Sequence, residues 1–244
     1  RARTAGLGGF EFACAIPGTI GGGVWMNSGN LNLSESASID HNYTNRPCSI
    51  GGGVSASSGT VTLADNSEIH HNIAANLDNL NGCAQGGGVA LGCATLVMSG
   101  NSSIYSNSAI SGTGGGVDML CAPTAADSPH AEVSLGGYAS IHDNTADLGG
   151  GIRSRTIGIT SNLNHIGIYG SASIYNNVAH YYSGYYAGNG GGLFLESTVL
   201  QFEYSGGTPI HNNTADDVGA HGGGVYAIGS TTLIGSSYNA STSV

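Results

Sequence analysis

Apolar residues recur along this chain in pairs two positions apart, at fixed places relative to a block of three glycines. One pair follows the glycines, and a second pair precedes an isoleucine further along. A spacing of two places both side chains on one face of a β-strand. The pattern therefore predicts short strands with one buried face. Helices are disfavoured, because an interior glycine costs a helix about 1 kcal/mol and these repeats carry three together.

The glycine block is followed by an aliphatic residue and occurs seven times, beginning at Gly21, Gly51, Gly86, Gly114, Gly149, Gly190 and Gly222. An Ile-x-x-Asn motif follows six of the blocks, with its isoleucines at Ile39, Ile69, Ile104, Ile141, Ile174 and Ile210. Because one repeat cannot bury its apolar face alone, stacked coils about 4.8 Å apart would build the core. We expect an all-β fold, a right-handed parallel β-helix (solenoid) of about seven coils with three short strands each. This repeat domain would span 21–244, after an N-terminal segment (1–20) that forms a partial coil or an assembly strand.

Two repeat positions have predicted structural roles. The glycine block is expected at a tight corner, where Cβ atoms would clash. The asparagine of each Ile-x-x-Asn motif is expected to point inward and to bond its amide to the coils above and below. This ladder would consist of Asn42, Asn72, Asn107, Asn144, Asn177 and Asn213.

Register also predicts the cysteine pairing. Cys93 and Cys121 each lie seven residues after the start of a glycine block, and Cys48 and Cys83 each lie three residues before one. Equivalent Cα atoms on neighbouring coils are about 5 Å apart, within disulfide range. We expect Cys93–Cys121 and Cys48–Cys83, with Cys14 unpaired or intermolecular, and reduced buried thiols as the alternative. Two bridges would place the chain in an oxidising, extracellular compartment.

Composition excludes several classes of function. The chain has 15 acidic residues, five arginines and no lysine, with a net charge of −10, which argues against nucleic acid as a partner. No apolar run approaches the roughly 20 residues of a membrane-spanning helix. We expect no cofactor and no bound metal.

The outward positions of the strands that follow the glycine blocks are where a β-helix enzyme would carry its catalytic carboxylates. Carbohydrate-active enzymes need two or three clustered carboxylates. These columns instead pair single carboxylates with single arginines, Asp118 with Arg153 and Glu196 with Arg155, and we expect cross-coil ion pairs there. We therefore do not expect an enzyme.

A minority alternative is that insertions between strands, near 121–130 and 157–164, supply acidic groups such as Asp127 and Glu132. Histidines also gather around the Ile-x-x-Asn motifs, at His41, His70, His71, His142 and His211. Stacked His and Asp residues could bind a transition metal, but a solvated polar ladder is the favoured interpretation.

The best candidate for recognition is the long aromatic turn after Asn177. Tyrosine supplies contact area at low entropic cost and stacks on sugars or partner proteins. The candidate loop residues are His180, Tyr181, Tyr182, Tyr185 and Tyr186.

The alternation of Gly-Gly-Gly-Val with Ile-x-x-Asn over residues 21–228 resembles the repeats of polymorphic outer-membrane proteins, which are bacterial surface β-helices of the autotransporter-passenger type. This resemblance implies an extracellular passenger with adhesive roles. Residues 9–30, which contain Ile16-Pro17-Gly18 and Met26-Asn27, resemble the flavin-binding segment of UDP-N-acetylenolpyruvoylglucosamine reductase. In that family the Ile-Pro-Gly turn approaches the FAD pyrophosphate, but the family's catalytic residues have no counterpart here.

These features together predict an extracellular, cell-surface structural or adhesive solenoid. With no capping helix visible at either end, the chain is expected to self-associate head-to-tail into a filament, unless it is an excerpt of a longer passenger. The expected partners are a second copy, a glycan or a host cell-surface protein. A glycan-binding or polysaccharide-degrading β-helix protein is the alternative.

Overall fold

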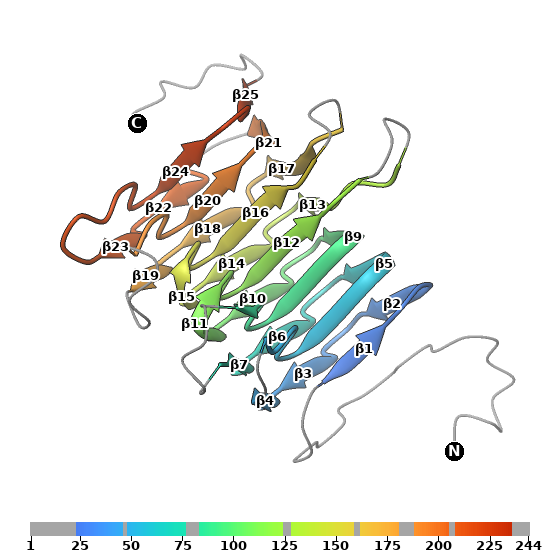
Figure 1. Cartoon of the computed structure of the whole chain (residues 1–244). Helices are drawn as coiled ribbons and strands as arrows, with labels where there is room; N and C mark the ends of the chain where they lie inside the picture. Colours follow the sequence, from blue (N-terminus) through green and yellow to red (C-terminus); the bar gives the residue numbers. More distant parts are fainter. Residues whose placement is uncertain are drawn as a thin grey trace, which may run out of the picture.

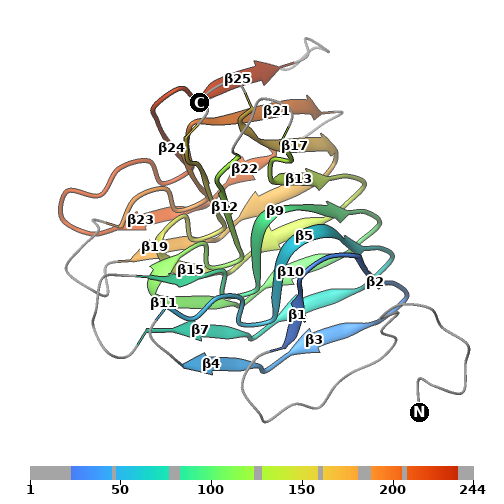
Figure 2. The same ribbon diagram turned by 45° about the vertical axis from the view of Figure 1, so that its right-hand side comes forward.

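The structure is a computed structural model that describes residues 23–45, 48–76, 83–123, 128–158, 162–180, 188–204 and 208–235. All regular secondary structure in these ranges is β-strand. Every strand pairing is parallel, and the strands stack into coils along one axis (Figures 1 and 2). The parallel β-helix predicted from the repeats is therefore confirmed. No helical segment in the described ranges has the length and hydropathy that a membrane crossing would need.

The first two strands of each coil belong to one twelve-stranded sheet. The strands that follow the glycine blocks are β1 (Val24–Met26), β5 (Val54–Leu63), β9 (Val89–Met98), β12 (Val117–Cys121), β16 (Ile152–Thr156), β20 (Leu193–Glu196) and β24 (Val225–Ile228). The strands that carry the second apolar pair are β2 (Asn30–Leu33), β13 (Glu132–Leu135), β17 (Asn164–Gly170), β21 (Thr198–Tyr204) and β25 (Thr232–Gly235). In two coils the two segments are continuous, so β5 and β9 each serve as both.

Two smaller sheets complete the coil, one on each side of the asparagine ladder. The strands that contain the motif isoleucines are β3 (Ser38–Asp40), β6 (Glu68–His70), β10 (Ser103–Tyr105), β14 (Ser140–His142), β18 (Ser173–Tyr175) and β22 (Ile210–His211). The strands after the asparagines are β4 (Tyr43–Asn45), β7 (Ile73–Ala75), β11 (Ser108–Thr113), β15 (Thr145–Leu148), β19 (Val178–His180) and β23 (Thr214–Asp216), with β8 (Ala84–Gln85) pairing beside β11.

The architecture differs from the prediction in two details. A coil has a fourth strand, the one after the asparagine, because a small residue two positions beyond it points inward; Ala74, Ala109, Ala146 and Ala179 are fully buried there. Complete coils are also fewer than seven, since the sheet of isoleucine strands has six members in the described ranges.

The core is a continuous apolar column inside the coils. The motif isoleucines lie in exact vertical register through the sheet that begins at β3, and most of them are fully buried. At most glycine corners there is no room for a side chain. A Cβ on Gly115 would overlap the backbone oxygens of Thr145 and Gly150, so the block brings neighbouring coils into backbone contact.

Cross-links tie the coils together. Both predicted disulfides are confirmed: Cys48–Cys83, with Cα atoms 4.6 Å apart, and Cys93–Cys121, with Cα atoms 4.9 Å apart. Residues 1–22 lie outside the described residues, and Cys14 with them.

Both expected ion pairs also form. Arg155 Nε lies 3.1 Å from Glu196 Oε2 near the surface, and Arg153 Nη1 lies 3.3 Å from Asp118 Oδ1. The second pair is buried, although it lies on the outward side of its strands. Thr113, which ends the preceding strand β11, donates a hydrogen bond to Asp118 across the glycine corner. Burial raises the pKa of Asp118, against the opposing effect of Arg153.

Candidate functional site

The outer face of the sheet from β3 to β22 carries many of the titratable side chains in the described part of the chain. The residue after each motif isoleucine points outward, because side chains alternate along a strand. Five of these residues are rings that stack coil upon coil, alternating histidine and tyrosine: His70, Tyr105, His142, Tyr175 and His211. Successive ring centroids are 4.8, 5.1, 4.7 and 5.1 Å apart, with interplanar angles from 1° to 16°. We call this column the ring ladder. Its spacing is that of adjacent parallel strands.

A sharp bend follows each ring, and in the first coil it follows Asp40, which occupies the equivalent position. The next residue has a positive φ between 51° and 54° in all six coils, at His41, His71, Ser106, Asp143, Asn176 and Asn212. Most of these are His, Asn or Asp, the residue types that tolerate the left-handed region best after glycine. The bend turns the chain so that the ring faces solvent and the asparagine two positions later faces the core.

The asparagine side chains form a hydrogen-bonded column behind this face. In each step the backbone N–H and the Nδ2 of one asparagine donate to the Oδ1 of the next, from Asn42 through to Asn213, at 2.9–3.1 Å. The same Nδ2 groups also donate to backbone carbonyls, as Asn107 does to Ile69. Each amide therefore satisfies its own buried groups and those of its neighbour.

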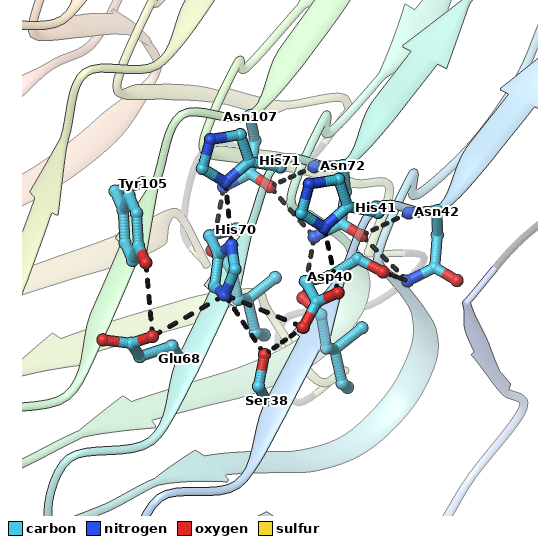
Figure 3. A network of polar contacts seen from close by, with 12 residues as sticks. Ser38, Asp40, His41, Asn42, Glu68, His70, His71, Asn72, Tyr105 and Asn107 are labelled. Atoms are coloured by element: carbon cyan, nitrogen blue, oxygen red, sulfur yellow. Dashed lines mark hydrogen bonds and ion pairs between the residues drawn. The ribbon is translucent and has the colours of Figure 1, made fainter. Parts of the chain in front are cut away.

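A polar network lies at the start of the ring ladder, on β3 and β6 (Figure 3). Ser38 Oγ donates to Asp40 Oδ2 at 2.6 Å and lies 3.2 Å from His70 Nε2. His70 Nδ1 lies 2.8 Å from His71 Nδ1, and His41 Nδ1 lies 3.0 Å from Asp40 Oδ1. Three histidines, a carboxylate and a hydroxyl from two coils thus share one chain of contacts.

The protonation states follow from the donors and acceptors. The hydrogen bond from Ser38, and then that from His41, hold the pKa of Asp40 below its usual value, so Asp40 is an ionised acceptor. Burial lowers the pKa of His70, although Asp40 and Glu68 act in the opposite direction. Ser38 gives its single proton to Asp40, so His70 Nε2–H must donate to Ser38 and His70 Nδ1 must accept from His71.

The direction of these hydrogen bonds decides the chemistry of the network. A serine nucleophile needs a histidine that accepts its proton. Here Ser38 instead donates to the carboxylate of Asp40 and accepts from His70. Ser38 is therefore not activated as a nucleophile, and the hydrogen bonds hold these side chains in position. Within the described residues, no group of three or more His, Cys, Asp or Glu side chains is placed to hold a metal ion.

Tyr105 links the network to the ladder. Its hydroxyl donates to Glu68 Oε2 at 3.2 Å, and its ring stacks on His70. Burial, followed by the charge and hydrogen bond of Glu68, raises the pKa of Tyr105. The alternation of His and Tyr at this position was visible in the repeats, but stacking depends on rotamers that the sequence does not specify.

The structure places the other predicted site residues as follows. Tyr181, Tyr182, Tyr185 and Tyr186 lie outside the described residues, as does Asp127. His180 ends β19, with its Nδ1 3.5 Å from Asp216 Oδ2 on the next coil.

Comparisons with known proteins add one local match. No protein-family profile matches the chain, and no solved structure matches it. A stretch of 29 residues is 66% identical to UDP-N-acetylenolpyruvoylglucosamine reductase 2 of Symbiobacterium thermophilum, which amounts to 12% of this chain and 9% of that enzyme. Of the resembling segment, residues 23–30 are described, and Val24–Met26 pair in register with Val54–Ala56 as the first strand of the solenoid. This part of the segment therefore belongs to the β-helix.

Proposed function

We propose that this chain is an extracellular structural and adhesive solenoid, a stiff rod whose outer faces carry recognition surfaces. The observation that carries the proposal is the asparagine ladder, which links six consecutive coils through paired side-chain hydrogen bonds without a break. The ring ladder repeats the same arrangement on the outer face, and two disulfides add covalent ties. Side chains at equivalent positions thus resist separation of the coils along the axis.

The disulfides support an extracellular location, because such bonds persist in oxidising compartments and are rare in a reducing cytosol. We further propose kinship with the surface β-helices of the polymorphic outer-membrane protein type. The glycine block and the Ile-x-x-Asn motif carry this resemblance, and both lie where the coil restricts which residues fit. The glycine block lies at the backbone contact between coils, and the asparagine points inward after the left-handed bend.

Head-to-tail association into a filament is part of this proposal. A coil of a parallel β-helix can pair with a further coil along the axis, and a second copy of the chain would supply one.

Negative-stain electron microscopy of the purified chain at micromolar concentration tests the proposal. Rods of uniform width are expected for the stiff solenoid, and long unbranched fibres for head-to-tail association. Discrete rods that do not lengthen with concentration would refute the filament, and flexible or collapsed particles would refute the structural role. Intact-mass analysis after alkylation, with and without reductant, gives an independent reading of the disulfides.

A further inference from the structure

A second cluster of polar side chains lies on the outer face of β13, β17 and β21, apart from the ring ladder. These three strands lie side by side and pair in continuous register (Figures 1 and 2). Alternate residues point into the core, where Val133, Ile166 and Ile168 are fully buried. The residues between them point outward and form what we call the β17 face: Glu132, His165, Tyr169, Gln201 and Glu203.

The β17 face is ordered by its own contacts. His165 Nε2 lies 3.1 Å from Gln201 Oε1, and Gln201 Nε2 donates to Glu203 Oε1 at 2.9 Å. An amide oxygen only accepts, so His165 carries its proton on Nε2. His165 Nδ1 then faces Glu132 Oε1 at 3.9 Å. The amide of Gln201 is therefore fixed in one orientation between a histidine and a carboxylate.

The ring of Tyr169 occupies space that is free because Gly167 has no side chain. A Cβ on Gly167 would overlap the ring and hydroxyl of Tyr169, so the tyrosine covers the glycine between His165 and itself on the same strand. Burial, then the charges of Glu203 and Glu132, raise the pKa of Tyr169, so its hydroxyl keeps its proton and can donate a hydrogen bond. An aromatic ring over a strand glycine, with polar groups around it, offers a sugar both an apolar contact and hydrogen-bonding partners.

The chemistry of the β17 face selects the class of ligand. Carboxylates, an oriented carboxamide, a phenol and an imidazole are donors and acceptors that match the hydroxyl groups of a sugar. The face contains two carboxylates and no arginine, and the chain has no lysine and a net charge of −10, so an acidic polymer would be repelled. We propose that the β17 face binds a neutral, hydroxyl-rich glycan. This inference rests on the adhesive part of the proposed function and names its ligand class.

Affinity electrophoresis of the full chain in native gels tests the proposal. The probes are the neutral polymers mixed-linkage β-glucan, amylopectin and galactomannan, with polygalacturonate as the acidic comparison. Retardation is expected with at least one neutral polymer and not with polygalacturonate. Gln201→Ala and Tyr169→Phe are each expected to weaken the apparent affinity by roughly two- to tenfold, the range that corresponds to one lost sugar-directed hydrogen bond.

The matched control is Tyr138→Phe, which removes a hydroxyl from a tyrosine that is 71% exposed and lies in a turn between β13 and β14. It is expected to leave retardation unchanged, and circular dichroism shows whether each variant keeps its fold. Retardation by polygalacturonate alone, by no polymer, or equally by the wild type and Gln201→Ala would overturn the proposal. Rods and protected disulfides in the same preparation would then show that the structural function stands without this glycan site.

Discussion

Replacing Asn107 with alanine tests whether the asparagine ladder holds the coils together. The side chain makes four hydrogen bonds: it accepts from the backbone N–H and Nδ2 of Asn72 and donates to Ile69 O and Asn144 Oδ1. Alanine removes all four and keeps the backbone bond from residue 107 to Asn144 Oδ1. Asn107 is only 1% exposed, so water does not readily replace the lost partners.

The size of the effect follows from which groups lose their partners. Asn72 Nδ2 keeps its bond to Ile39 O, but the fully buried N–H of Asn72 loses its acceptor. One orphaned buried donor costs about 1–3 kcal/mol, and each further lost hydrogen bond about 0.5–1.5 kcal/mol. With three such further bonds, the expected loss in the free energy of unfolding is roughly 2.5–7.5 kcal/mol, a large fraction of the stability of an ordinary domain.

The assay is urea unfolding followed by far-ultraviolet circular dichroism, with the slopes of the transitions compared between variants. The matched control is Asn101→Ala in the same coil, whose amide bonds Asn66 at an exposed turn. That change is expected to cost no more than about 0.5 kcal/mol. If Asn107→Ala loses no more stability than Asn101→Ala, the ladder is not what ties the coils together and the reasoning fails.

Three further changes test other parts of the fold. His70 has a pKa below its ordinary value of 6.5, so the stability that it contributes is present above pH 6.5 and is lost as the pH falls towards the lowered pKa. His70→Phe keeps a stacking ring and should make the melting temperature depend less on pH between pH 7 and pH 5. An unchanged pH dependence would count against this assignment. Gly115→Ala should prevent soluble expression because its Cβ meets backbone, whereas Gly136→Ala, whose Cβ would have only one neighbour at 3.8 Å, should express and melt like the wild type. Converting Cys93 and Cys121 to serine together should lower the free energy of unfolding by about 2–4 kcal/mol, as measured by urea unfolding. The control is the reduced wild type, whose free energy of unfolding should fall by at least as much relative to the oxidised protein.

The repeats made the architecture predictable. A side chain that recurs once per coil must stack on its equivalents, so the spacing of two within strands and the alignment of motifs between repeats determined the parallel register. The same reasoning predicted how the four cysteines pair. Two cysteines on neighbouring coils have Cα atoms within disulfide range only when they lie the same number of residues from their glycine blocks. The short strand after each asparagine was missed, although its signal, an alanine two positions beyond the asparagine, was present in most repeats.

The outer faces were less predictable, because several rotamers of an outward side chain have similar energies until its neighbours are placed. The sequence showed that His70 and Tyr105 share a column, but it did not show that their rings stack or that Ser38 gives its proton to Asp40. The β17 face depends on diagonal contacts between coils, such as that of His165 with Gln201.

The sequence by itself thus determined the solenoid, its register, the inward ladder and the disulfides, because each is repeated at a period that permits one stacking arrangement. Only the tertiary structure decided which exposed groups meet, that the Asp118–Arg153 pair is buried, and that the space above Gly167 holds a tyrosine. The buried ion pair and the tyrosine over a glycine do not repeat from coil to coil within the described residues, so no periodic signal encodes them, and they depend on how neighbouring side chains exclude water and fill space.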